Sequence, residues 1–292
     1  MLPGRVASDE PLAHWTSLRV GGPADALVRV DTRDELVRTL ALCRARALPV
    51  TILGGGFNAL VRDGGLRGVV VRLAGLREIA FEGDALVRAE AGVTHTQLTR
   101  FCAEQGRSGL EFAIGIPGTV GGWIAMNAGV RGREMKDLVT SLELFEPERA
   151  EIVARAREAL VFRYRKVELP PGAVVLSATF HTESAAPAEI RERQKQYLAQ
   201  RRATQPVDQP SCGSVFKNPP GDYAGRLIEA AGLKGAREGA AVISPLHANF
   251  IVNEGGARAG DVLALIERAR AEVAKQFGVE LETEVRISGE AP

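Results

Sequence analysis

The chain has 292 residues, of which 45% are hydrophobic and 25% charged, and its formal net charge at pH 7 is +1. A charge so close to zero argues against a nucleic-acid or anionic-membrane partner. No apolar run reaches the roughly 18 residues of a membrane-spanning helix or forms the core of a signal peptide, so we expect a cytoplasmic protein. Three cysteines and four histidines are scattered along the chain, which disfavours disulfides and a metal site. The length indicates two domains.

The first predicted elements lie between residues 14 and 53. Residues 14–30 form a loop leading into a strand that ends near Val30. Thr32 and Glu35 have the spacing of a capping box, which opens a helix that ends before Pro49. The apolar face of this helix is expected to contain Leu36, Val37, Leu40 and Ala41. Residues 50–53 then predict a short buried strand.

A glycine cluster follows this strand, at Gly54, Gly55 and Gly56 with Phe57, Asn58, Ala59 and Leu60. It formally satisfies the G-x-G-x-x-A pattern of dinucleotide-binding folds. That pattern must open a helix, whereas here more glycines and an apolar triplet at 69–71 predict another strand. We therefore reject a Rossmann domain and interpret the cluster as a loop that cradles phosphate.

Strands are predicted at 79–81 and 85–89, followed by a helix from Thr94 to Gly106. Thr94 and Gln97 again have capping-box spacing, and Leu98 and Phe101 are expected to face inward.

The most informative stretch is Gly115 to Gly129, with the sequence GIPGTVGGWIAMNAG. Five glycines leave the backbone N–H groups accessible and permit positive φ, which suits a loop pressed against an anionic ligand. Its apolar second half, residues 123–126, indicates that the loop enters a core. We interpret it as a cofactor-binding loop that is neither strand nor helix.

The last part of the chain predicts strands at 139–145 and 173–181 and a polar helix at 187–202. The proline-rich segment 205–210 is an extended linker and marks a domain boundary. Beyond it we expect a small α+β unit with an extended segment at 214–216, helices at 223–231 and 261–277, and strands at 247–253 and 281–287. Asp222 is expected to start the first of these helices and Gly232 to end it. In the final strand, alternation places Leu281, Thr283, Val285 and Ile287 on one face and Glu282, Glu284 and Arg286 on the other.

Three polar groups could carry chemistry. Tyr164, Arg165 and Lys166 could form an anion site or an exposed basic edge. Residues 211–219, with the sequence SCGSVFKNP, combine a hydroxyl with the cation of Lys217 and the amide of Asn218, although a plain turn also explains them. Glu284 could be a functional acid or an exposed strand carboxylate. Composition and spacing leave these alternatives open.

These motifs together resemble the UDP-N-acetylenolpyruvoylglucosamine reductase family, and they run in the family's order from about Thr16 to Ile287. The matching segments are GGGFNALVRD, GLEFAIGIPGTVGG, NAG, FRYR, SCGSVFKNP, AGRLIEAAGLKG, HANFIVN and LETEVRI. The short, uninterrupted C-terminal half is similar to the compact subtype that lacks an extra substrate loop.

The resemblance implies an α+β fold: a two-lobed FAD-binding module of the vanillyl-alcohol-oxidase type, then a small α+β substrate domain. The expected boundaries are 14–185 for the module, 186–210 for a helix and linker, and 211–292 for the substrate domain. It also implies a non-covalent FAD cofactor, NADPH as co-substrate and a small-molecule substrate, UDP-N-acetylglucosamine enolpyruvate, reduced to UDP-N-acetylmuramate for peptidoglycan synthesis.

The resemblance implies roles for individual residues. Ser214, Arg165 and Glu284 match catalytic positions, with Ser214 as the proton donor. Tyr164, Lys217 and Asn218 match substrate contacts. The residues expected at FAD are Gly54, Gly55, Gly56, Phe57, Asn58, Ala59 and Leu60, then Gly115, Pro117, Gly118, Thr119, Gly121, Gly122, Asn127 and Gly129.

The chain departs from the family pattern at a few positions. Phe57 stands where a serine is usual, which removes one hydroxyl that could donate to a phosphate. Trp123 replaces a small residue, and Arg131 with Gly132 replaces an aromatic-glycine pair; Arg131 could restore the lost polar contact or simply be exposed.

Two other functions compete with this interpretation. A related flavin oxidase would use oxygen in place of NADPH, and many of those tether the flavin to a His or Cys; no His lies beside either glycine loop here. A non-catalytic UDP-sugar-binding protein would not need Arg165, Ser214 and Glu284 together.

Overall fold

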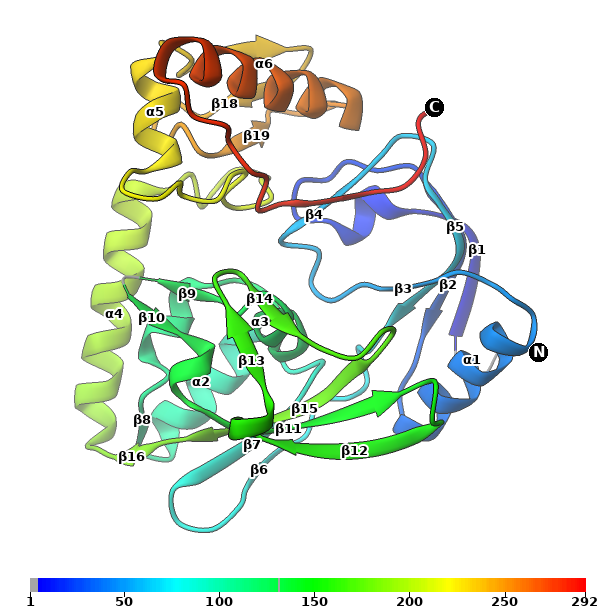
Figure 1. Ribbon diagram of the computed structural model, residues 1–292. Coiled ribbons are helices and arrows are strands. Elements are labelled where there is room, and N and C mark those ends of the chain that lie inside the picture. The colour runs from blue at the N-terminus through cyan, green and yellow to red at the C-terminus, as the bar shows by residue number, and fades with distance from the viewer. Residues whose placement is uncertain (1–4, 131) are drawn as a thin grey trace. The chain divides into compact units, whose positions relative to one another are not determined.

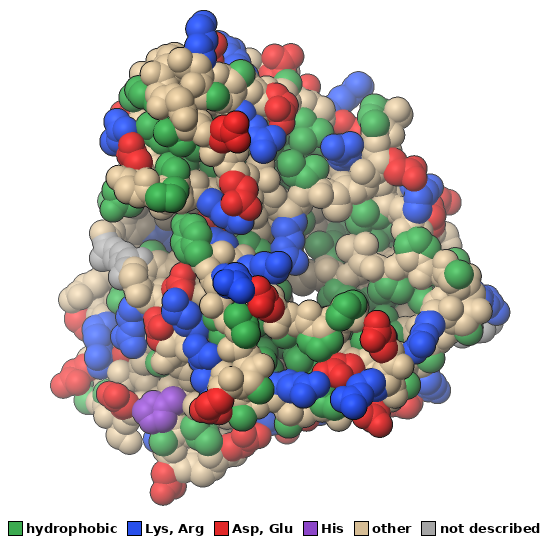
Figure 2. Space-filling model, viewed as in Figure 1, with side chains coloured by type: hydrophobic (Ala, Val, Ile, Leu, Met, Phe, Trp, Pro, Cys, Tyr) green, Lys and Arg blue, Asp and Glu red, His purple; other side chains and the backbone are tan. Residues whose placement is uncertain are grey.

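The computed structural model describes residues 5–130 and 132–292, so Arg131 lies outside the described residues (Figure 1). The chain forms two compact units. Unit 1 contains the residues up to Ala7, Ala26–Gly55 and Gly68–Gln200, and unit 2 contains Ser8–Asp25, Gly56–Arg67 and Arg201–Pro292. The functional boundaries expected from the sequence remain a prediction. On the face shown in Figure 2, basic and acidic side chains are interspersed, in keeping with the net charge of +1.

The larger sheet of unit 1 has five antiparallel strands in the order β12-β11-β15-β7-β6. Their bounds are β12 Glu151–Ala156, β11 Val139–Glu146, β15 Val174–His181, β7 Leu86–Glu90 and β6 Ile79–Phe81. The central strand β15 is buried along all but its last residue, because it pairs on both edges and packs against helix α3 (Val120–Ala125). The strands expected at 79–81, 85–89, 139–145 and 173–181 are confirmed.

The second sheet has the order β1-β2-β5-β3, with β1 Arg5–Pro11, β2 Pro23–Arg29, β5 Leu66–Arg72 and β3 Val50–Ile52. Strands β3 and β5 are parallel and pair Val50 with Val69. The prediction that the strand at 50–53 is buried is wrong: Val50 and Ile52 are 38% and 37% exposed. Strand β3 lies at the sheet edge, where fewer neighbours cover its side chains.

Helix α1 spans Arg33–Ala45, and the Thr32 hydroxyl accepts a hydrogen bond from the Glu35 N–H. The Glu35 carboxylate reaches back to the N–H of Asp31 and not of Thr32, so the capping box is only half formed. The expected apolar face is wrong at Ala41, which is exposed. The buried face contains Leu36, Thr39, Leu40 and Cys43.

Short elements complete unit 1. They are α2 (His95–Glu104), the pair β8 (Arg107–Ser108) and β16 (Glu183–Ser184), the pair β9 (Gly129–Val130) and β10 (Arg133–Glu134), the hairpin β13 (Val161–Arg163) and β14 (Lys166–Glu168), and three 3-10 turns at Glu111–Gly115, Met135–Asp137 and Arg157–Ala159. Helix α2 has the predicted capping box at Thr94 and Gln97. Helix α4 (Pro187–Thr204) confirms the predicted polar helix, with Ile190 as its buried residue.

Unit 2 is built around helix α6 (Ala259–Phe277), which packs on α5 (Ala224–Ala230) and on β18 (Ala241–Ile243) (Figure 1, yellow to red). Strand β18 lies between β17 (Arg237–Glu238) and β19 (Ile251–Asn253) in an antiparallel sheet. A parallel pair joins β4 (Ala59–Val61) to β20 (Arg286–Ser288), and a 3-10 turn covers Leu12–Trp15. The small α+β unit expected after the linker is therefore present, together with two N-terminal segments that pack with it.

Three local predictions in unit 2 need correction. The strand expected at 247–253 begins only at Ile251, because the Ser244 hydroxyl accepts from the N–H groups of Leu246 and His247 and forms a turn there. The strand expected at 281–287 is regular only from Arg286, although Leu281 and Val285 are buried on the predicted face. Helix α5 begins at Ala224 with Tyr223 as its N-cap, one residue later than predicted.

Candidate functional site

The stretch 115–129 contains a helix, so its description as neither strand nor helix is wrong. Residues 120–125 form α3, and Val120, Trp123 and Ile124 are buried on one face at helical spacing. The burial of these three side chains in the core of unit 1 outweighs the poor helix propensity of two adjacent glycines. The expectation that this half of the stretch enters a core is confirmed.

The glycines of this stretch face different surroundings. Gly118 has φ +133°, and a Cβ placed there would meet only the Trp123 ring, at 3.8 Å. A Cβ on Gly122 would meet only the Thr119 hydroxyl, at 3.7 Å. A Cβ on Gly54 would lie 3.0 Å from that same hydroxyl, which brings the two predicted cofactor loops together within unit 1. The backbone at Gly118 and Gly122 borders open space, as a cradle for a bulky anionic group requires, whereas Gly54 is in close contact with Thr119.

Other predicted cofactor residues are used inside the fold. Gly121 packs against Ala91, whose Cβ would lie 3.0 Å from an added methyl group, and a Cβ on Gly129 would lie 2.3 Å from the Arg133 carbonyl oxygen. Asn127 is fully buried, and its side-chain amide donates to the Glu134 carboxylate at 2.9 Å and to the Arg163 carbonyl at 3.0 Å. These three residues therefore shape the loop from within.

The hairpin β13–β14 presents Tyr164 and Arg165 at its turn. Arg165 has φ +58°, a conformation that is strained for a residue with a side chain. Its guanidinium donates to the Gly129 carbonyl oxygen at 3.2 Å and lies over the Tyr164 ring, 5.0 Å from the centroid. Since the Asn127 amide also holds Arg163, the 115–129 stretch fixes the hairpin that carries Arg165.

The second half of the first glycine cluster lies in unit 2. Gly56 has φ +70° and packs against Trp15, whose carbonyl oxygen would lie 2.1 Å from a Cβ. Leu60 is completely buried in the unit 2 core, which places its side chain among structural residues. The Asn58 side-chain amide donates to the Glu284 carbonyl oxygen at 3.0 Å, and the Asn58 carbonyl accepts from the Arg286 N–H at 3.1 Å. This loop is thereby anchored to the segment that carries Glu284.

Ser214 and Glu284 lie on neighbouring backbone segments. The Glu284 N–H donates to the Val215 carbonyl oxygen at 2.8 Å, and Phe216 forms an isolated β-bridge with Thr283. Both Ser214 and Glu284 are half-buried. The structure therefore brings together two of the three predicted catalytic residues within unit 2.

Lys217 and Asn218 have partners inside unit 2. The Lys217 ammonium forms an ion pair with the Glu282 carboxylate, and its backbone N–H donates to the Glu282 carbonyl oxygen at 2.9 Å. The Asn218 side-chain oxygen accepts from the Ala224 N–H at 3.1 Å, so Asn218 caps the first turn of α5.

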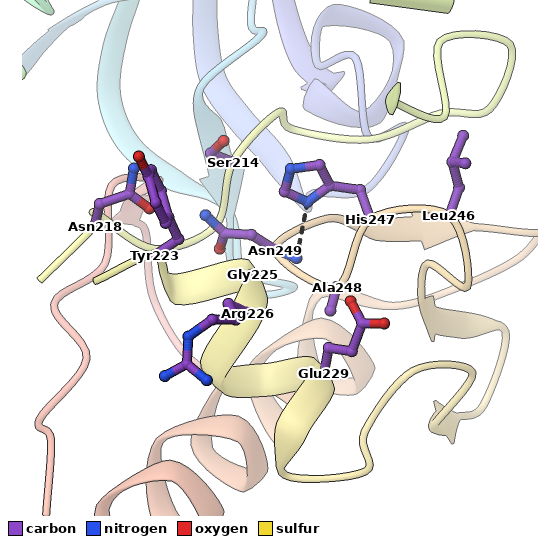
Figure 3. Close-up of a pocket in the computed structure, with 10 residues that line it drawn as sticks. All are labelled: Ser214, Asn218, Tyr223, Gly225, Arg226, Glu229, Leu246, His247, Ala248 and Asn249. Atoms are coloured by element: carbon purple, nitrogen blue, oxygen red, sulfur yellow. Dashed lines mark hydrogen bonds between the residues drawn. The ribbon is translucent and has the colours of Figure 1, made fainter. Parts of the chain in front are cut away.

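A pocket of about 400 Å³ opens beside Ser214 (Figure 3). It is lined by Ser214, Asn218, Tyr223, Gly225, Arg226, Glu229, Leu246, His247, Ala248 and Asn249. Sequence reasoning predicts a site role for only Ser214 and Asn218 among these. The matching segments AGRLIEAAGLKG and HANFIVN contain all the others except Tyr223 and Leu246, so family resemblance points to these segments. Their convergence on one cavity is a property of the fold that no local pattern reports.

Burial and hydrogen bonding shift the pKa values of three ionisable groups in and near this pocket. Burial lowers the pKa of the His247 imidazole below its ordinary value, and its Nδ1 accepts from the Asn249 N–H at 3.2 Å. The pKa of Asp222 is lowered to about 2, mainly by the hydrogen bond from the Arg226 guanidinium and secondly by the hydrogen bond from the Tyr223 N–H. Burial raises the pKa of the Cys212 thiol to about 12, so this neighbour of Ser214 stays protonated and is a poor nucleophile.

The predicted site residues divide between the two units. Unit 1 contains Gly54, Gly55, Gly115, Pro117, Gly118, Thr119, Gly121, Gly122, Asn127, Gly129, Tyr164 and Arg165. Unit 2 contains Gly56, Phe57, Asn58, Ala59, Leu60, Ser214, Lys217, Asn218 and Glu284. Within residues 5–130 and 132–292, no group of three or more His, Cys, Asp and Glu could hold a metal ion, and no helix is long and apolar enough to cross a membrane.

Comparisons with known proteins cover both halves of the chain. Residues 24–154 match the family described as FAD binding domain, and residues 205–288 match the C-terminal domain of UDP-N-acetylenolpyruvoylglucosamine reductase. The chain is 50% identical to the UDP-N-acetylenolpyruvoylglucosamine reductase of Anaeromyxobacter dehalogenans over 99% of its length and 87% of the relative. It is 46% identical to that of Geobacter metallireducens, over 99% of this chain and 96% of the relative.

Solved structures give the same picture. The crystal structure of the UDP-N-acetylenolpyruvylglucosamine reductase from Thermus caldophilus matches with a TM-score of 0.84 and 40% identity, over 98% of this chain and 99% of that one. An alkyldihydroxyacetonephosphate synthase matches with a TM-score of 0.50 and 15% identity, over 63% of this chain and 38% of that one, which indicates a shared fold only.

Proposed function

Since the chain belongs to the UDP-N-acetylenolpyruvoylglucosamine reductase family and is therefore an FAD-dependent oxidoreductase, we propose that Ser214 protonates its substrate during an NADPH-dependent reduction. The substrate is the enolpyruvyl ether of UDP-N-acetylglucosamine and the product is UDP-N-acetylmuramate. The observation that carries the proposal is the bond between the Glu284 N–H and the Val215 carbonyl, which holds Glu284 beside the Ser214 segment at the edge of a pocket.

The residues of unit 1 fit FAD. Gly118 and Gly122 border open space, and Gly54 lies beside Thr119, so the backbone there would hold the diphosphate. FAD, when bound, supplies a carrier for the hydride that NADPH provides. We propose functional boundaries of 14–185 for the cofactor module, 186–210 for the helix and linker, and 211–292 for the substrate domain.

Arg165 has the charge that the reaction needs. Hydride addition to the β-carbon of the enolpyruvyl group makes a carbanion next to a carboxylate, and the guanidinium pairs with the growing negative charge. Preorganised donors of this kind are worth about 3 to 4 kcal/mol each in the transition state. The Gly129 carbonyl and the Tyr164 ring hold the guanidinium in place before the charge develops.

Ser214 and Glu284 complete the reaction in this proposal. The Ser214 hydroxyl delivers a proton to the α-carbon, and Glu284 in its protonated form donates a hydrogen bond to the enolate. Tyr164, Lys217 and Asn218 contact the substrate, and the pocket beside Ser214 accepts its nucleotide-sugar portion. Lys217 lies three residues after Ser214, and its ammonium forms an ion pair with the Glu282 carboxylate.

Ser214→Ala tests this assignment by separating the two half-reactions. Anaerobic bleaching of the flavin by NADPH should stay within about three-fold of wild type, because no substrate carbanion is present in that step. Reoxidation by UDP-N-acetylglucosamine enolpyruvate should slow by about 10²- to 10⁴-fold, the usual range for a lost general acid. Stopped-flow absorbance of the flavin measures both rates in one preparation. Equal losses in the two steps would instead give Ser214 a role in binding the cofactor, and no loss in either would shift the proton donor to another residue.

A further inference from the structure

The segment that carries Ser214 is held by one buried side chain, Asn249. The Asn249 side-chain oxygen accepts from the Phe216 N–H at 2.9 Å, and its side-chain nitrogen donates to the Phe216 carbonyl oxygen at 2.8 Å. The Asn249 backbone carbonyl also accepts from the Val215 N–H at 2.9 Å. Three hydrogen bonds from one residue therefore fix the two residues that follow Ser214.

Burial makes the loss of these hydrogen bonds costly. Asn249 is 3% exposed, so its amide has little access to water as an alternative partner. An amide has one acceptor end and one donor end, and both ends here bind the same residue, Phe216. These two hydrogen bonds resemble the pair that a residue exchanges with a neighbouring β-strand, except that a side chain makes them. They fix which residue of the segment, Phe216, lies opposite Asn249.

The other edge of the same segment is bound to the segment that carries Glu284. The Val215 carbonyl oxygen accepts from the N–H groups of Glu284 and Val285, at 2.8 Å and 3.2 Å. Asn249 thus binds one edge of the Val215–Phe216 backbone while the Glu284 segment binds the other. A displaced Phe216 would move Ser214 relative to Glu284.

We propose that Asn249 is a positioning residue for proton transfer. It sets the position of the Ser214 hydroxyl through its two side-chain hydrogen bonds to the backbone of Phe216. This rests on the proposed role of Ser214. Figure 3 shows Asn249 between Ser214 and the α5 side of the pocket, with its own N–H bonded to His247. Both ends of its side-chain amide bind the Phe216 backbone, so Asn249 acts on the segment of Ser214 in addition to lining the pocket.

Asn249→Leu removes both amide contacts and keeps the branching and the number of heavy atoms of the side chain. We expect reoxidation of the reduced flavin by the enolpyruvyl substrate to slow about 10- to 100-fold, since a displacement near 1 Å has that effect on a positioned group. Bleaching by NADPH should stay within about three-fold of wild type. Amide hydrogen exchange in the peptide covering residues 212–218 should accelerate in the free protein, because the Phe216 N–H loses its acceptor. This readout does not depend on turnover.

A double-mutant cycle separates positioning from general damage. In a Ser214→Ala background, Asn249→Leu should slow reoxidation by less than about three-fold more, because the hydroxyl that it positions is already gone. A full further loss in that background would overturn the proposal, as would wild-type reoxidation in the single variant. If Ser214→Ala itself reoxidises at the wild-type rate, the role of Ser214 fails, and the proposal for Asn249 fails with it. That result differs from a slow Ser214→Ala with a normal Asn249→Leu, which overturns the proposal for Asn249 alone.

Asn253 provides a matched control in the same unit. It is 6% exposed, donates to the Leu18 carbonyl oxygen at 3.0 Å, and accepts from the N–H groups of Gly255 and Ala257. Asn253→Leu should lower the urea midpoint about as much as Asn249→Leu and leave both half-reactions within about three-fold of wild type. If Asn249→Leu does not fold, Asn249→Asp keeps the acceptor for the Phe216 N–H and loses the donor. It should show the same selective loss in reoxidation, and equal losses in both half-reactions would contradict the proposal.

Discussion

Individual glycines in the 115–129 stretch have separate tasks that the sequence alone does not distinguish. Gly118 needs its left-handed backbone and borders open space, whereas Gly121 and Gly129 are required by neighbours inside unit 1. Gly122 lies within helix α3, and it is absent from the residues with positive φ. Substitution at Gly122 therefore tests the open space itself, free of backbone strain.

Gly122→Val should abolish retention of FAD, because a branched side chain would fill the space where the diphosphate is proposed to lie. Gly122→Ala should weaken FAD binding while the apoprotein keeps or gains stability, since alanine favours a helix by about 1 kcal/mol over glycine. Flavin content after gel filtration and the urea midpoint of the apoprotein measure the two effects.

Gly83 is the control for backbone strain elsewhere in unit 1. It has φ +79° and lies between β6 and β7, and a Cβ added there would have no atom within 4 Å. Gly83→Val and Gly118→Val both force a side chain into a left-handed conformation, so a loss of FAD in Gly118→Val alone assigns the effect to the cradle. Normal flavin content in both Gly118→Val and Gly122→Val would place the diphosphate elsewhere.

At the level of elements, the start of helix α6 is bound by a residue distant in sequence. The Asp63 carboxylate accepts from the N–H groups of Ala259 and Gly260, both at 2.9 Å. These are two of the N–H groups that a helix leaves without intrahelical partners, and a carboxylate there also interacts favourably with the helix dipole. The segment after the Gly54–Leu60 cluster is thereby joined to the longest helix of unit 2.

Asp63→Ala should lower the free energy of unfolding by about 1 to 2 kcal/mol, as expected for a lost helix cap. Asp63→Asn should lose less, because one oxygen remains as an acceptor. Urea unfolding followed by far-UV circular dichroism measures the change, with Asp208→Ala, an exposed carboxylate in the 205–210 linker, as the control. Equal midpoints for Asp63→Ala and Asp208→Ala would show that the cap contributes nothing.

The whole molecule should become less stable in mild acid because of His247. Burial lowers the pKa of its imidazole in the folded protein, so the unfolded chain takes up the proton first as the pH falls. The stabilisation is complete above the ordinary pKa of about 6.5 and is lost as the pH falls through that value toward the folded pKa. Urea midpoints at pH 7.5 and 5.5 should therefore differ less in His247→Gln than in wild type. The exposed His14 gives the control His14→Gln, and an unchanged pH response in His247→Gln would exclude His247 as the cause.

The protein should carry FAD without a covalent bond. Heat denaturation should release the flavin into the supernatant, and flavin that remains with the precipitated protein would contradict this. Free FAD at about 100 times its dissociation constant should stabilise the folded apoprotein by roughly 2.7 kcal/mol, which appears as a higher melting temperature.

Much of the fold follows from local patterns, and the exceptions have physical causes. Local patterns predict α2, α4, α6 and the strands β7, β11 and β15, whereas the mostly exposed strands β1 and β12 are not predicted. Helices α2 and α6 bury a full face, and α4 is recognised by its polar, charge-rich composition. Local patterns do not predict helix α3, because tertiary burial of Val120, Trp123 and Ile124 overrides glycine propensity. Strand β18 has only three residues and offers too short a period to recognise.

The candidate site is predictable to different degrees for different residues. Ser214, Arg165 and Glu284 come from family resemblance, which matches motifs wherever they lie. The role of Asn249 depends on a partner 33 positions away along the chain, and no local pattern reports such a pairing. The same reason hides the link between Asn58 and Glu284, which are 226 positions apart.

The interleaving of the two units has a consequence for synthesis on the ribosome. The chain passes between the units at residues 7/8, 25/26, 55/56, 67/68 and 200/201. Leu18, Val20 and Leu60 belong to the core of unit 2, whose other described members are all translated after Arg201. At 5 to 20 residues per second, the 133 residues Gly68–Gln200 that separate these segments from the rest of unit 2 take roughly 7 to 27 s. Until the residues beyond Arg201 emerge, these apolar side chains lack most of their native partners, so the nascent chain presents binding sites for chaperones.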